Sequence, residues 1–412
     1  MSSSDALSAS AAEAQHRRVL AVVPVLSIAG CASGISQRVL DPLLPSLSGE
    51  FGQPLSVVVW VITSFSLGYA VSQLFFGPFG DRYGKLRVIT WVCGGSSLAA
   101  VLCALAPTLP ALIGGRIFAG AMCAGLIPLS MAWLGDAVPY ERRQPVIARF
   151  AVGQILGVSL GQLLGGIASD HLGRQAPFVL LTVLFAVSTL LLYRLCGGME
   201  AFRAPAGKPR DTSLLLLLRE FGLVLAEPWA RVVLVSVFLE GAFVLGAFAF
   251  FTTHLHTTLH VSLTAAASAS MLFGLGGLVF SLTARRLLGR FGEVGLVRCG
   301  ALLLLSMMGV VALVPQILVV GVACLILGVG FYMLHSTLQT HATQMAPERR
   351  GAAVAAFALS YFVGQAVGVS AVGWALVQTS AASVIVVAGV GVTLTALYFS
   401  HSQARHLLLA KR

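Results

Sequence analysis

Long apolar segments dominate the chain and are separated by short polar or Gly/Pro-rich turns. Each segment can cross a hydrocarbon core of ~30 Å as a helix, which takes about 20 apolar residues. Twelve such segments can be placed, at residues 19–46, 54–78, 86–107, 109–134, 145–169, 175–195, 229–253, 263–284, 294–314, 317–340, 352–377 and 382–400. The pattern predicts an all-α membrane protein with twelve spans, six on each side of a polar stretch.

The composition changes this picture only by excluding alternatives. Of 412 residues, 57% are apolar and 10% are charged, and the mean hydropathy is +0.91. An average soluble domain is roughly 25% charged, because its surface faces water. An ordinary soluble enzyme is therefore excluded. No phosphate-binding loop or nucleotide-binding pattern is present, so we expect no enzyme activity, no cofactor and no metal centre, with energy supplied by the proton gradient.

The basic residues gather on one side of the predicted membrane. Lys and Arg number 26 against 15 Asp and Glu, which gives a formal net charge of +11. If the N-terminus is inside, 23 of the 26 basic residues fall in inner segments, and Arg38, Arg116 and Arg174 are the exceptions. The asymmetry predicts a multi-pass plasma membrane protein, as in a bacterial inner membrane, with both termini cytoplasmic. The excess charge favours anionic membrane lipid as a partner over nucleic acid.

An internal repeat divides the chain. A shift of 207 positions aligns Glu141-Arg142-Arg143 with Glu348-Arg349-Arg350 and Gly157 with Gly364, and a shift of 208 aligns Gly84 with Gly292. Two six-helix halves of parallel topology are typical of rocking-bundle transporters. We expect an N-terminal tail at 1–18, a six-helix bundle at 19–195, a cytoplasmic linker at 196–228, a second bundle at 229–400 and a basic tail at 401–412.

The linker contains one short apolar run, Leu214 to Leu218. It is too short to cross the membrane, and Arg219 and Glu220 follow it directly. The run predicts a helix that lies on the inner membrane surface.

The loop after the second span carries a recognisable motif. Gly77, Asp81, Arg82, Gly84 and Lys85 stand at the glycine, Asp-Arg and glycine-plus-basic positions of the signature loop of the major facilitator superfamily, which this chain resembles over nearly its whole length. The resemblance implies the major facilitator fold, with two six-helix bundles related by a pseudo-two-fold axis, and a monomer.

That resemblance also implies a cytoplasmic gate. In the outward-facing state, the carboxylate of Asp81 would cap the positive end of the helix that begins near Ala352. We include the basic residues Arg142 and Arg349 in the gate. The alternative is a basic loop that only fixes the topology.

Two opposite charges lie in the outer third of the membrane. Arg116 and Gly120 of the fourth span resemble the intramembrane arginine motif of the superfamily, and Asp41 of the first span should reach a similar depth beside Arg38. A buried guanidinium is costly unless it is paired or faces water, so function is the default hypothesis. We expect Asp41 and Arg116 to pair and to couple protons to transport. A static pair that joins the two helices is the alternative.

Glu240 is the other acidic residue deep in the membrane, about midway along the seventh span. It faces the central cavity as a substrate or proton site, or it is a neutral acid that only packs. The side chains that we expect to line the substrate cavity are Arg38, Trp60, Tyr69, Glu240, Phe331, Tyr332, His335 and Tyr361. Lipid contact or core packing is the alternative for the aromatic ones.

The fifth span carries a stripe of small residues at Gly157, Gly161, Gly165 and Gly166. The stripe resembles the glycine motif of antiporters in the superfamily, although Gln162 replaces its usual proline. Close helix packing and an antiporter hinge both fit this spacing.

Three histidines crowd the outer end of the seventh span. His256 and His260 would share one face of a helix, with His254 nearby. Metal binding and a solvated loop are both consistent with them.

These features predict a secondary transporter that works by alternating access. We expect a small, partly apolar organic substrate, exported in exchange for protons. Uptake of a metabolite or a metal-chelate complex, or a scaffold without transport, are the alternatives.

Overall fold

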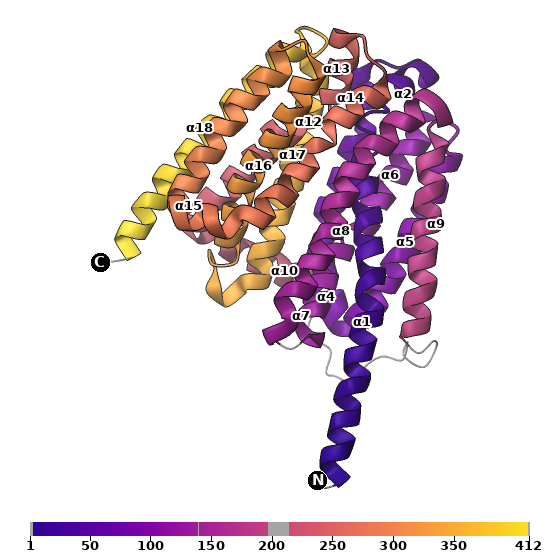
Figure 1. Ribbon diagram of the computed structural model, residues 1–412, viewed down its shortest axis with the longest axis vertical. Helices are drawn as coiled ribbons and strands as arrows, with labels where there is room; N and C mark the ends of the chain where they lie inside the picture. Colours follow the sequence, from indigo (N-terminus) through magenta and orange to yellow (C-terminus); the bar gives the residue numbers. More distant parts are fainter. Residues whose placement is uncertain (1–2, 139, 197–213, 411–412) are drawn as a thin grey trace.

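The computed structural model describes residues 3–138, 140–196 and 214–410 and is helical throughout (Figure 1). The helices of the first half are α1 (Ser3–Arg38), α2 (Leu44–Phe51), α3 (Leu55–Val58), α4 (Trp60–Tyr83), α5 (Lys85–Leu105), α6 (Leu109–Cys123), α7 (Leu126–Ala137), α8 (Tyr140–Ile167), η1 (Ala168–Leu172) and α9 (Gln175–Leu195). The helices of the second half are α10 (Leu214–Ala226), α11 (Pro228–Glu240), η3 (Gly241–Leu245), α12 (Gly246–Phe248), α13 (Phe251–Leu259), α14 (Leu263–Ser270), α15 (Leu272–Leu313), α16 (Ile317–Ala342), η4 (Pro347–Arg349), α17 (Arg350–Ala375) and α18 (Ala381–Ala410).

The prediction of twelve membrane crossings is confirmed. Eleven helical segments of the described chain are long and apolar enough to span a bilayer, and one of them, Leu263–Leu313, has 51 residues. Gly292 interrupts that segment with a φ of 63° and a ψ of 175°, which is not helical. The long segment therefore supplies two crossings, because 20 residues suffice for each.

The first span is shorter than its apolar pattern suggests. We expected one span over 19–46, but α1 ends at Arg38 and α2 begins only at Leu44. Pro42 lacks a backbone N–H and disfavours a helical conformation in the residue before it. Asp41 therefore lies in a turn between two helices, where its own N–H bonds to the carbonyl of Arg38 at 3.2 Å.

The two bundles repeat the same helix contacts, as a pseudo-two-fold relation requires. A Cβ atom added to Gly157 would meet the carbonyl of Cys31, and one added to Gly364 would meet the carbonyl of Phe238. Each residue of the second pair stands 207 positions after its counterpart in the first. The next turn repeats the relation, with Gly161 against Ile35 and Gly368 against Ala242.

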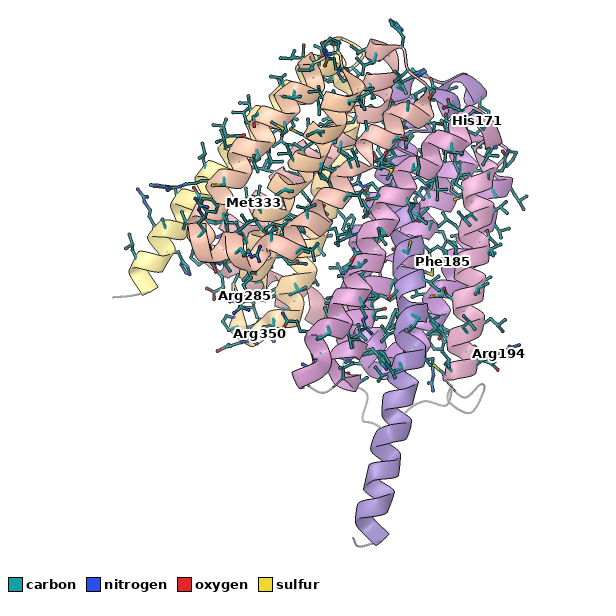
Figure 2. The ribbon with its side chains drawn as sticks, viewed as in Figure 1. His171, Phe185, Arg194, Arg285, Met333 and Arg350 are labelled. Carbon is teal, nitrogen blue, oxygen red and sulfur yellow. The ribbon has the colours of Figure 1, made fainter. Side chains whose placement is uncertain are left out.

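In Figure 1 the N-terminus lies at the bottom and the C-terminus at the left, at the lower end of α18. We call the end of the bundles from which both termini project the terminal side, and the opposite end the distal side. The side-chain view places Arg194, Arg285 and Arg350 toward the terminal side and His171 on the distal side (Figure 2). The chain from 197 to 213, which includes most of the expected linker, lies outside the described residues. Its last part forms helix α10 from Leu214.

The bundles are joined on the distal side. Between described residues, three sets of hydrogen bonds connect them: Thr63 with Ser370, Gln162 with Thr252, and Asp170 with Leu263 and Thr264. Gly166 and Gly373 also touch the opposite bundle there, at Ala267 and Val59. The structure is therefore closed on the distal side.

Candidate functional site

Glu240 is the last residue of α11 and is completely buried. The chain continues from it into the π-helical turn η3, a distortion that is common at functional sites. Nδ1 of His335 on α16 lies 2.8 Å from Oε2 of Glu240, while Oε1 has no hydrogen-bond partner among the described residues. A buried carboxyl group with one unsatisfied oxygen is costly unless a proton or ligand reaches it.

Aromatic rings enclose the pair of Glu240 and His335. The His335 ring stacks on Phe331 at 5.2 Å between centroids and lies 4.9 Å from the ring of Tyr361. Tyr332 contacts Phe331 edge-on at 5.2 Å. The structure therefore brings together five residues that the sequence assigned to the cavity.

The aromatic contacts continue into the first bundle. Tyr361 contacts Phe362 at 5.3 Å, and Phe362 lies 4.0 Å from Tyr69 on α4. Tyr69 follows Phe65, whose ring lies 4.1 Å from the guanidinium carbon of Arg116. The rings thus connect the Glu240 site with the arginine of the first bundle.

Trp60 is not part of this arrangement. Its side chain is 46% exposed, and none of the aromatic contacts above involves it. The expected cavity role of Trp60 therefore gains no support from the structure.

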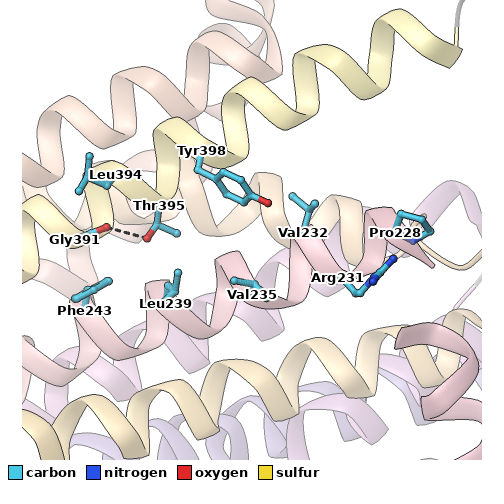
Figure 3. A pocket seen from close by; sticks show the side chains of 10 residues that line it. All are labelled: Pro228, Arg231, Val232, Val235, Leu239, Phe243, Gly391, Leu394, Thr395 and Tyr398. Carbon is cyan, nitrogen blue, oxygen red and sulfur yellow. Dashed lines mark hydrogen bonds between the residues drawn. The ribbon is translucent and has the colours of Figure 1, made fainter. Parts of the chain in front are cut away.

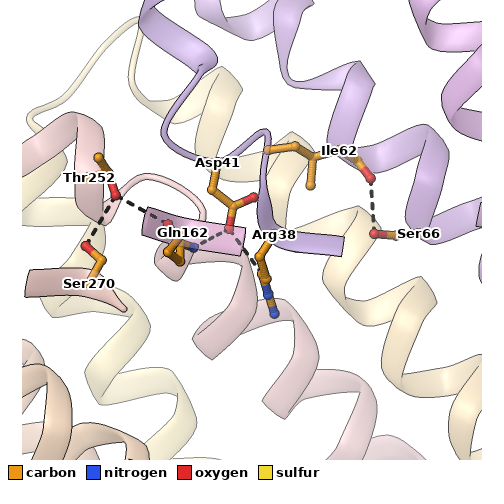
Figure 4. A network of polar contacts seen from close by, with 7 residues as sticks. All are labelled: Arg38, Asp41, Ile62, Ser66, Gln162, Thr252 and Ser270. Atoms are coloured by element: carbon orange, nitrogen blue, oxygen red, sulfur yellow. Dashed lines mark hydrogen bonds and ion pairs between the residues drawn. The ribbon is translucent and has the colours of Figure 1, made fainter. Parts of the chain in front are cut away.

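The expected ion pair between Asp41 and Arg116 is wrong. Nη1 of Arg38 donates to Oδ2 of Asp41 at 3.4 Å, and Nε2 of Gln162 donates to the same oxygen at 2.8 Å (Figure 4). Arg116 instead donates to the carbonyl of Val61 at 3.1 Å. The helix break at Pro42 turns Asp41 toward α8, a change of direction that a continuous span 1 would not make.

Arg116 is held by neutral groups. Its Nη1 donates to Oγ of Ser36 at 3.4 Å, and its guanidinium faces the Phe65 ring. Ser36 and Phe65 were not predicted, because a hydroxyl and a phenyl ring in apolar spans carry no distinctive signal. Gln162 did carry a signal, since it replaces the proline usual at that position.

Gln162 also reaches the other bundle. Oγ1 of Thr252 lies 3.5 Å from Oε1 of Gln162 and 3.3 Å from Oγ of Ser270 (Figure 4). Gln162, Thr252 and Ser270 are all buried. A polar chain therefore runs from Asp41 across the interface between the bundles.

The glycines of the fifth span allow this close approach. Gly157, Gly161 and Gly165 pack against the backbone of α1 and the turn after it, whereas Gly166 packs against Leu263 and Thr264 of the other bundle. On the distal side, helix α8 thus packs against elements of both bundles. Close helix packing therefore explains the stripe of glycines. The antiporter hinge stays a prediction.

The signature loop lies on the terminal side. Gly84 separates α4 from α5 with a φ of 90°, a conformation that favours glycine, and Gly292 does the same in the second bundle. Lys85 forms an ion pair with Asp136 at the end of α7. Asp81 is exposed and has no ion-pair partner in the described chain, so it does not cap α17 in this structure.

The other expected gate residues are on the same side. Arg82 lies over the Tyr83 ring at 5.1 Å, and a Cβ atom added to Gly77 would meet nothing within 4 Å. Nε of Arg349 lies 3.1 Å from a carboxylate oxygen of Glu220 on α10. The side chain of Arg142 lies outside the described part of the structure.

The expected shared face of His256 and His260 is wrong. Helix α13 ends at Leu259, and His260 has a φ of 53°, which takes it off the helix. Nδ1 of His256 lies 2.6 Å from the carbonyl of Val261, and Nδ1 of His254 lies 3.2 Å from Oγ1 of Thr258. Within the described residues, no three potential metal ligands gather.

Comparisons with known proteins agree with the fold. The model of the Major Facilitator Superfamily matches residues 26–369. The chain is 26% identical over 353 residues to YceJ, an uncharacterized MFS-type transporter of Bacillus subtilis (strain 168), which covers 83% of this chain and 85% of YceJ. It is 30% identical over 146 residues to the multidrug export protein EmrB of Escherichia coli (strain K12), which covers 35% of this chain and 28% of EmrB.

A solved structure shares the whole architecture. The nucleoside transporter NupG superposes with a TM-score of 0.74 at 14% sequence identity, over 93% of this chain and 98% of NupG. At this identity the likeness concerns the fold alone. Since the family model covers most of both bundles, the chain belongs to the Major Facilitator Superfamily of membrane transporters.

Proposed function

We propose that the protein exports a small, partly apolar organic molecule in exchange for protons. One observation carries the proposal: among the described residues, each bundle holds one buried acidic residue beside a basic one, and each acid has one oxygen without a hydrogen-bond partner. Asp41 lies beside Arg38 in the first bundle, and Glu240 lies beside His335 in the second. A buried acid that gains or loses a proton changes the charge of its site, which is what coupling requires.

The aromatic side chains suit an apolar substrate. Tyr69, Tyr361 and Phe362 join the two bundles through ring contacts. The ring of His335, which contacts Glu240, lies 4.9 Å from the Tyr361 ring. Rings offer stacking surface to a flat organic molecule, and the charged groups provide orientation. Closure on the distal side implies that the substrate reaches this region from the terminal side, which we take as cytoplasmic.

Export is favoured by the function of a relative. EmrB is described as a multidrug export protein, and the match with it is limited to 146 residues. The proposal includes the division into bundles 19–195 and 229–400 joined by the linker 196–228, cytoplasmic termini and a monomer. It assigns proton coupling to Asp41, Arg116 and Glu240.

Reconstituted liposomes with an imposed pH gradient test the proposal. Ethidium and norfloxacin serve as fluorescent probes, and an internal pH dye reports the proton flux. We expect probe movement that requires the gradient, and loss of this gradient dependence in Asp41→Asn and Glu240→Gln. Glu227→Gln is the matched control, because Glu227 is exposed and its side chain caps no helix. Uphill movement that persists in both acid variants would disprove the coupling scheme.

A further inference from the structure

A groove of about 630 Å³ runs between α11 and α18 (Figure 3). Its walls are almost entirely apolar and include Val232, Val235, Leu239, Phe243 and Leu394. The Thr395 hydroxyl in the wall donates to the carbonyl of Gly391 at 2.8 Å. The inner part of the groove therefore offers an apolar ligand contact surface without a free hydrogen-bond donor.

The groove is polar at one end only. Arg231, one turn into α11, and the exposed Tyr398 stand at its terminal-side mouth. Groove-lining positions of α18 follow a helical spacing through Gly391, Leu394, Thr395 and Tyr398, and the same spacing continues to Arg405.

The charge at the mouth is positive. Arg231 and Arg405 are exposed and have no ion-pair partner among the described side chains. Glu227, one turn before Arg231, is the one acidic residue close to them in sequence on these two helices. Arg231 lines the groove, and Arg405 lies about two turns beyond Tyr398 on α18, so two guanidiniums against one carboxylate favour binding of an anion near this end.

The depth of the groove matches one leaflet. Arg231 and Phe243 are twelve positions apart, and a rise of ~1.5 Å per residue gives about 18 Å, a little more than half of a ~30 Å hydrocarbon core. A ligand that fits has an anionic head at the membrane surface and an apolar tail that ends near the midplane. A phospholipid has this shape.

We propose that this groove is a binding site for an anionic phospholipid of the terminal-side leaflet. The phosphate binds Arg231, and an acyl chain lies along Val235, Leu239 and Phe243. Leu239 and Phe243 flank Glu240 in sequence, so the chain contacts the same helical turn from the outside. The proposal concerns binding and is independent of the transport activity proposed above.

Native mass spectrometry of the full chain in a mild detergent tests the site. The protein is titrated with phosphatidylglycerol, phosphatidylethanolamine and phosphatidylcholine of identical acyl chains. A surface Arg contributes about 1 kcal/mol to anionic lipid binding, so Arg231→Gln should weaken phosphatidylglycerol binding about fivefold. Val235→Trp, at a position that is 52% exposed, should fill the groove and lower binding of all three lipids.

The matched control is Arg194→Gln. Arg194 is an exposed basic residue at the terminal-side end of α9 in the other bundle, and it does not line the groove. This variant should keep the affinity for phosphatidylglycerol. Equal binding of phosphatidylglycerol and phosphatidylcholine, or equal losses in Arg231→Gln and Arg194→Gln, would overturn the proposal.

Discussion

Gln162 donates a hydrogen bond to Oδ2 of Asp41 at 2.8 Å, and through its other amide atom it meets Thr252 of the opposite bundle at 3.5 Å. One buried side chain thus contacts both the acid of the first bundle and the interface that closes the distal side. The proline usual at this position in related antiporters has no donor to offer. In this chain, the state of Asp41 and distal closure share a hydrogen-bonded connection.

Replacement of Gln162 by Leu should break that connection. The change leaves a buried carboxylate without its nearest donor, which costs about 1–3 kcal/mol of stability. Thermal unfolding in detergent measures the loss. Gln154→Leu on the same helix is the control, because the Gln154 side chain has no hydrogen bond among the described residues. Similar melting temperatures for the two variants would contradict the assigned role.

His335→Phe should show how much the hydrogen bond between His335 and Glu240 contributes to the stability of the protein. The phenyl ring preserves stacking on Phe331, while the bond at 2.8 Å to Glu240 is lost. We expect destabilisation by about 1–3 kcal/mol, since a buried polar group loses its hydrogen-bond partner. In a double-mutant cycle, His335→Phe should cost less once Glu240→Leu, which removes both carboxylate oxygens, is present. Additive effects would show that the pair is energetically independent.

Gly157→Ala and Gly364→Ala should have matching effects. Both glycines face a backbone carbonyl of the paired helix, so a methyl group must push the helices apart, at a cost of about 1–3 kcal/mol. Gly114→Ala is the control, because nothing lies within 4 Å of the added Cβ. Unfolding measurements on the three variants test this. A neutral Gly157→Ala would argue against the observed helix contact.

Asp170→Asn should weaken distal closure. The Asp170 carboxylate accepts bonds from the backbone N–H of Thr264 at 2.7 Å and of Leu263 at 3.3 Å, at the positive end of α14. The amide of Asn carries no net charge, so it interacts more weakly with the positive end of α14 than the carboxylate does. Spin labels at the exposed distal positions Leu105 and Leu313 report the separation of the bundles.

We expect a larger fraction of long distances between those labels in Asp170→Asn. Before labelling, Cys31 and Cys299 are replaced, because they are the two partly exposed cysteines among the described residues. Glu50→Gln is the control, because Glu50 pairs with Arg174 at 2.6 Å inside the first bundle. Equal distance distributions in the two variants would show that Asp170 does not contribute to distal closure.

Much of the architecture follows from local sequence. The length of apolar runs determines twelve crossings, because a spanning helix must satisfy its backbone internally. The repeat also predicts geometry: Gly84 and Gly292 share a positive φ at equivalent turns. Their flanking residues, Lys85 and Glu293, differ in charge, and they pair with Asp136 and His341 at the ends of equivalent spans.

The sequence also predicted members of the site, since Asp41, Arg116, Glu240 and His335 are polar groups in apolar spans. Only the tertiary structure decided their partners. A break at Pro42 moved Asp41 away from Arg116, and the packing of α8 on two bundles brought Gln162 to it. Spacing along one helix predicts depth in the membrane, but partners depend on how helices turn and pack against each other. That arrangement is a property of the whole fold.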